Sequence, residues 1–95
     1  MDIRHQIQAV NDTTPVLVLP DLGLSVQYSV NFTVQNISAS ATVYMGSDSV
    51  QSNDYGIKLE AGAIASFDGF QRNAQLFAIT DTGSSASVAV LRVSQ

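Results

Sequence analysis

The sequence has no cysteine, no tryptophan and one histidine, His5, among its 95 residues. Without cysteine there is no disulfide, no thiol nucleophile and no thiolate-bound zinc or iron–sulfur centre. His5 is the one candidate catalytic base, but the sequence has no Gly-x-Ser-x-Gly motif to supply a serine nucleophile for it. Asp48 and Asp54 share a loop, but their spacing matches no calcium-binding motif. The sequence therefore predicts no enzyme, no metal site and no cofactor.

Charge is also scarce. Charged residues make up 13 % of the chain, about half of the ~25 % found in an average soluble domain. Eight acidic residues against four basic ones give a net charge of −4. The basic residues are scattered, so they offer no cluster for a run of phosphates, and we expect no nucleic-acid binding. Either uncharged polar groups keep this surface wet, or a partner covers part of it.

Long apolar runs are missing as well. No run approaches the ~20 residues that a membrane-spanning helix needs. The first residues, Met1 to Gln6, include an acid and are not followed by an apolar stretch of signal-peptide length. We therefore expect no membrane partner, no cleaved signal and synthesis in a cytoplasm.

The clearest pattern present is a strict alternation over residues 24–35. Even positions are apolar or aromatic and odd positions are polar and uncharged, which predicts a strand with one buried and one wet face. Neutral polar side chains can hydrogen-bond across an interface without desolvating a charge. The wet face is thus a candidate partner contact, with an ordinary solvated face as the alternative. It consists of Ser25, Gln27, Ser29, Asn31, Thr33 and Gln35.

The rest of the chain indicates further short strands. The run 16–19, closed by a proline at each end, predicts a brief strand or an extended edge segment. Residues 3–10 predict a strand with Ile3, His5, Ile7 and Ala9 on one face, or else a mobile arm. We therefore divide the chain into an N-terminal arm or edge strand, 1–14, and a single β-sandwich domain, 15–95.

Polar turns separate the remaining strands, which we expect at 41–45, 57–59, 63–67, 76–79 and 86–93. The run 76–79 is apolar throughout and predicts a strand buried on both faces. No segment has helical periodicity with caps. Short strands with a turn every ten or so residues predict an all-β fold, a small antiparallel β-sandwich or barrel of jelly-roll-like type.

The second half of the chain carries a recognisable order of motifs. A Val-Tyr-Met-Gly strand end (43–46) leads to a Ser-Asn-Asp-Tyr-Gly loop (52–56) and a Glu-Ala-Gly turn (60–62). A Leu-Phe-Ala-Ile strand (76–79) and a terminal Val-rich strand (88–93) follow. This order resembles a module of small tailed-phage virion proteins. The resemblance implies a β-sandwich subunit of a virion and carries over no catalytic residue.

Within that resemblance, the leading hypothesis is a capsid decoration (cement) protein that binds and stabilises the outer surface of the head. It would be made in the host cytoplasm and act as a homo-oligomer, expected to be a trimer, on the major capsid protein. The alternative is a tail, neck or fibre accessory protein that recognises the host. For that role Tyr55, in the polar loop 47–56, is the candidate contact.

Overall fold

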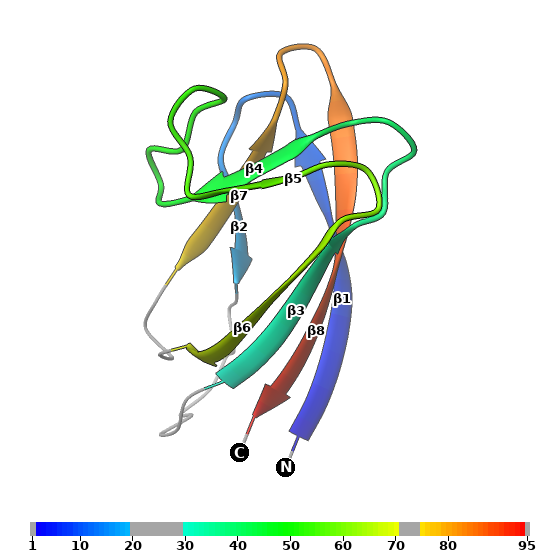
Figure 1. The fold of residues 1–95 in the computed structure, drawn as a ribbon, viewed down its shortest axis with the longest axis vertical. Coiled ribbons are helices and arrows are strands. Elements are labelled where there is room, and N and C mark those ends of the chain that lie inside the picture. The colour runs from blue at the N-terminus through cyan, green and yellow to red at the C-terminus, as the bar shows by residue number, and fades with distance from the viewer. Residues whose placement is uncertain (1, 20–29, 71–74, 95) are drawn as a thin grey trace.

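The computed structural model describes residues 2–19, 30–70 and 75–94 (Figure 1). Within these ranges the chain forms eight strands and no helix, so the all-β prediction is confirmed. The strands are β1 (Asp2–Asn11), β2 (Val16–Leu19), β3 (Val30–Asn36), β4 (Val43–Gly46), β5 (Ile57–Leu59), β6 (Ile64–Phe70), β7 (Leu76–Thr80) and β8 (Ser85–Ser94).

The eight strands form two four-stranded antiparallel sheets. The first sheet has the order β1-β8-β3-β6 and the second the order β2-β7-β4-β5. Strand β1 pairs with β8, β2 with β7, β3 with β6 and β4 with β5, as in one long hairpin. The additional pairs β3–β8 and β4–β7 roll that hairpin into two layers. This is the topology of an eight-stranded jelly roll.

The N-terminal segment is an edge strand of the first sheet. Ten consecutive residue pairs join β1 to β8, from Asp2 with Ser94 to Asn11 with Ser85. Of the two interpretations of this segment, arm or edge strand, the structure therefore has the strand. The predicted strand 24–35 is described from Val30 onward, as β3, and residues 24–29 lie outside the described residues.

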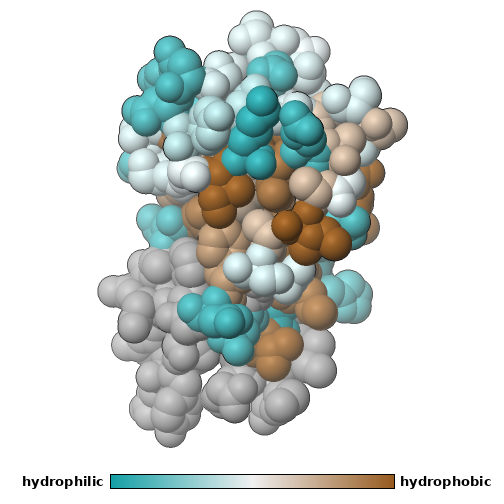
Figure 2. Space-filling view, viewed as in Figure 1, coloured by the Kyte–Doolittle hydropathy of each residue, from teal (hydrophilic) through white to brown (hydrophobic). Residues whose placement is uncertain are grey.

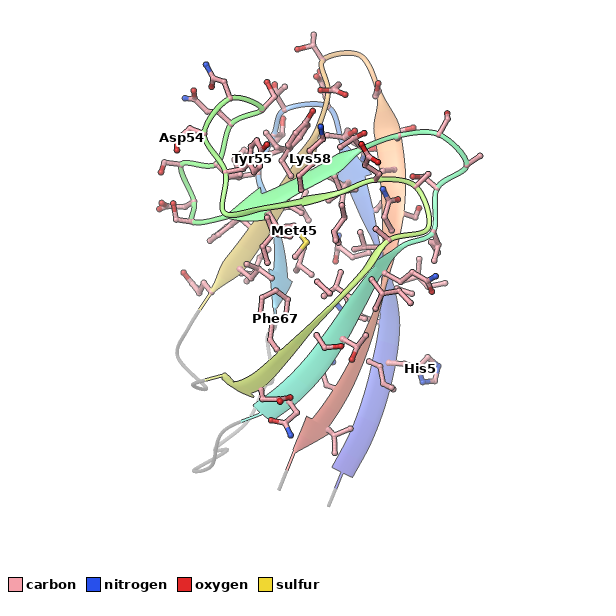
Figure 3. The ribbon with its side chains drawn as sticks, viewed as in Figure 1. His5, Met45, Asp54, Tyr55, Lys58 and Phe67 are labelled. Atoms are coloured by element: carbon pink, nitrogen blue, oxygen red, sulfur yellow. The ribbon has the colours of Figure 1, made fainter. Side chains whose placement is uncertain are left out.

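The core lies between the two sheets and consists mainly of valine and other short apolar side chains. Successive side chains of each strand alternate between this core and the outside. Met45 is fully buried in the core and Phe67 packs against it (Figure 3). The buried members are Val10, Val18, Val34, Val43, Met45, Leu59, Leu76, Ala78, Ala86, Val88 and Val90.

A buried amide, Asn36, ties the two sheets together at the end of β3. Its Nδ2 donates to the carbonyl oxygens of Ala41 (2.8 Å) and Leu59 (2.9 Å), the latter on β5 of the other sheet. Its Oδ1 accepts from the amide of Ser38 (3.0 Å) and from the Ser38 hydroxyl. The sequence indicated only a polar turn at this point, but the side chain is a fully buried crosslink.

A second junction closes the loop end of the molecule around Asp12. Asp12 has a φ of 55°, a conformation that aspartate tolerates better than most residues. Its amide donates to Ser84 (2.8 Å), and its carbonyl accepts from Thr80 (2.9 Å). Its Oδ1 accepts from the amide of Gly83 (3.1 Å). The end of β1 is thereby fixed to the turn between β7 and β8.

Substitution of Asn36 by alanine tests the crosslink. Asn36→Ala leaves the carbonyls of Ala41 and Leu59 without their donor, which is expected to lower the free energy of unfolding by about 2–4 kcal/mol. Denaturant titration measures this loss. The matched control is Asn53→Ala in an exposed loop, expected to stay within about 0.5 kcal/mol of the parent. Equal effects of the two substitutions would contradict the crosslink.

Candidate functional site

The outer faces of the two sheets differ in how they are covered. On the second sheet, the loop after β4 folds back over the strands and buries Val50 against Tyr44 and Ile79, with Phe77 packed beside them. Strand β7 is therefore enclosed on both sides, as its apolar run predicted. The chain thus covers this part of its own outer surface.

Among the described residues, no loop covers the outer face of the first sheet in this way. Three large apolar side chains point outward there: Ile7 is 69 % exposed, Ile64 59 % and Leu91 46 %. His5 also points away from the molecule, from β1 (Figure 3). We call this surface the outer apolar face, and define it by His5, Ile7, Thr33, Gln35, Ile64, Ala89 and Leu91, which line a depression of about 360 Å³.

The strand register arranges these side chains in two rows across the sheet. One row runs Ile7, Ala89, Gln35, Ile64. The next runs His5, Leu91, Thr33, Ser66. The hydroxyls of Thr33 and Ser66 lie 3.2 Å apart and share a hydrogen bond. Neither row contains a carboxylate, an ammonium or a guanidinium group, so a protein can cover this surface without desolvating such a charge.

The predicted contact residues reach this surface in part. Asn31 is exposed, and Thr33 and Gln35 are half-buried among the apolar side chains. Ser25, Gln27 and Ser29 lie outside the described residues. The prediction missed Leu91 and Ile64 as contacts. The signal for Leu91 was present in β8, where Ala89 and Leu91 alternate with the buried Val88 and Val90, but alternation alone does not say which side faces out.

The space-filling view agrees with an uneven distribution of polarity. Hydrophilic side chains gather over the loops at the top of the molecule, and apolar side chains lie in the middle (Figure 2). The carboxylates of Asp12, Asp48, Asp54, Glu60 and Asp81 all belong to the segments that connect strands. These five carboxylates thus lie in loops, whereas Asp68 is exposed on β6 of the first sheet. None of the residues that define the outer apolar face is acidic.

Tyr55 lies apart from the outer apolar face, in the loop before β5. It is 43 % exposed, and its ring contacts that of Tyr44 with a centroid distance of 5.1 Å and a tilt of 48°. The same loop borders a cavity of about 510 Å³ lined by polar side chains that include Asp48, Gln51 and Asn53. The Tyr55 ring is thus fixed on one side and open on the other.

Among the described residues, no three His, Asp or Glu side chains come together as a metal site. None of these residues builds a helix with the length and apolarity to cross a bilayer. Comparison of the chain with family models, with curated proteins and with solved structures finds no match.

Ionisation of the Tyr44 hydroxyl is expected to lower the free energy of unfolding at alkaline pH. Desolvation raises the pKa of the Tyr44 hydroxyl above its ordinary value of 10.0, and its hydrogen bond with Asp81 raises it further. The folded chain therefore holds this proton more tightly than the unfolded chain does. The resulting stability is full below about pH 10 and is lost as the pH rises through the folded-state pKa.

Denaturant titrations between neutral and alkaline pH measure this effect. The Tyr44→Phe variant, which has no hydroxyl to ionise, should show a shallower loss of unfolding free energy above about pH 10. The same loss in variant and parent would assign the alkaline dependence to other groups.

Proposed function

We propose that this protein is a structural protein of a tailed-phage virion that acts by protein contact through its outer apolar face. The most specific form of the proposal is a decoration protein that binds the outer surface of the head, with the major capsid protein as partner, and stabilises it. It is made in the host cytoplasm and joins the particle there. It performs no catalysis in this role.

One observation carries the proposal. The chain covers the outer face of its second sheet with its own loop, yet it leaves Ile7, Ile64 and Leu91 exposed on the first. Contiguous exposed apolar surface of this kind marks sites of protein interaction, because a monomer gains nothing from keeping it in water. Its uncharged polar neighbours, Thr33 and Gln35, are suited to such a contact.

The fold adds support by analogy. Eight-stranded jelly rolls occur in viral capsid and lectin domains, although one fold serves many functions. The motif order in the second half of the chain points to virions among these. We include self-association in the proposal; the number of three subunits rests on the resemblance alone.

A tail, neck or fibre accessory protein that recognises the host is the second candidate. Tyr55 favours it, because its exposed ring is held against Tyr44 and lines a polar pocket of about 260 Å³ together with Ser47 and Asp54. Aromatic rings and convergent polar groups of this kind occur in ligand sites. In this case the loop end, and not the outer apolar face, would make the essential contact.

Binding to purified heads of the parent phage separates the two candidates. Leu91→Lys places an ammonium group in the middle of the outer apolar face and is expected to weaken head binding roughly tenfold or more, which corresponds to about 1.4 kcal/mol. Tyr55→Ala is the matched control and should bind like the parent. Co-sedimentation measures both.

The reverse result, in which Tyr55→Ala loses binding and Leu91→Lys retains it, would contradict the head assignment and favour the second candidate. Copy number per virion gives an independent reading. Hundreds of copies fit the head, whereas a few to a dozen contradict it.

A further inference from the structure

The four strand edges of the sandwich are protected to different degrees. Strand β2 has four residues between two prolines of the sequence, and β5 has three residues. Strand β6 has a register irregularity against β3 and carries the exposed Asp68. Short strands, prolines, register irregularities and charged side chains are features that keep an edge strand from pairing with another chain. Strand β1 has ten residues in unbroken register, with no proline.

The hydrogen-bond pattern shows which groups of β1 face this free edge. In an antiparallel pair, alternate residues bond the neighbour with both N–H and C=O, and those between point away. The bond from the Asp12 amide to the Ser84 carbonyl continues the β1–β8 register, so the even residues of β1 bond β8. The bond from the Ile37 amide to the Ser87 carbonyl continues the β3–β8 register, so the odd residues of β8 bond β3. The even residues of β8 are therefore left to bond the even residues of β1, in agreement with the first assignment.

The odd residues of β1 therefore direct their N–H and C=O groups outward. These residues are Ile3, His5, Ile7 and Ala9. Within the described part of the chain, a single hydrogen bond reaches this stretch of edge, from Nε2 of Gln8 to the carbonyl of Ala9 (3.1 Å). The edge thus presents a row of backbone donors and acceptors that can template another strand.

Charge favours this edge as the place where two copies meet. Each copy carries a net charge of −4, so contact through the acidic loops would bring like charges together. Along β1, the segment from His5 to Asn11 contains no carboxylate. Two acidic chains can therefore approach along β1 without that repulsion.

We propose that β1 pairs antiparallel with β1 of a second copy of this chain about a two-fold axis, which joins two first sheets into one continuous sheet. An axis perpendicular to the sheet is the symmetry that a self-complementary edge requires. It keeps the outer apolar faces of both copies on one side and brings the Ile7 side chains of the two β1 strands close to the axis. The dimer does not depend on where the protein acts, and it stands in place of the trimer expected from the resemblance.

Sedimentation equilibrium of the parent and two variants tests the proposal. The parent should have twice the monomer mass of 10.1 kDa. Ile7→Pro removes an N–H that faces the free edge and none that bonds β8, so the variant should fold and sediment as a monomer. Leu91→Lys, on a strand paired on both sides, is the matched control: it alters the outer apolar face without touching the edge and should stay dimeric.

Several results would overturn the proposal. They are a monomeric or trimeric parent, a dimeric Ile7→Pro, or a monomeric Leu91→Lys, which would indicate contact through the faces. Amide hydrogen exchange of the parent keeps the test decisive if Ile7→Pro fails to fold. The amides of His5 and Ile7 should be protected at concentrations where the dimer forms and exchange rapidly on dilution. Rapid exchange at both concentrations would contradict edge pairing.

The dimer proposal and the head-binding proposal can each be contradicted without affecting the other. Leu91→Lys is expected to lose head binding while it remains dimeric. A parent that binds heads as a monomer would retain the proposed function and remove the dimer.

Discussion

Strand β8 is apolar on both of its faces, whereas a two-layer sandwich has a core on only one side of each sheet. Ala86, Val88 and Val90 fill that core, so the alternate residues Ala89 and Leu91 face outward. Because β8 lies between β1 and β3, its register also places Ile7 and Thr33 on the same outer surface. The outer apolar face is thus a direct consequence of how the hairpin rolls up.

The rolled hairpin itself depends on a few polar residues at its corners. Asn36 spans from β3 to the carbonyl of Leu59 in the opposite sheet, and Asp12 fixes the end of β1 to the neighbouring turn. These hydrogen bonds satisfy backbone groups that the change of sheet leaves without strand partners. The residues that define the outer apolar face include no acid, while Asp12, Asp48, Asp54, Glu60 and Asp81 lie in the loops.

Much of the fold could be predicted from the sequence, because local patterns encode strands and turns. The described part of the alternation over 24–35, the continuous apolar run of β7 and the proline-bounded β2 all correspond to observed strands. The side of β1 that faces out could not be predicted. Its odd residues are the more apolar set, yet the structure turns Ile7 outward and leaves the even residues Gln6 and Gln8 half-buried. The long-range pairing with β8 decides this, and no local pattern records it.

The central claim is that protein covers the outer apolar face when the molecule acts. Covalent footprinting with a small photo-activated carbene measures this directly, on the free protein and on intact virions. The account predicts strong labelling of Ile7, Ile64 and Leu91 in free protein and loss of label at Ile64 and Leu91, which lie away from the β1 edge, in the particle. Equal labelling of these two residues in both states would contradict it.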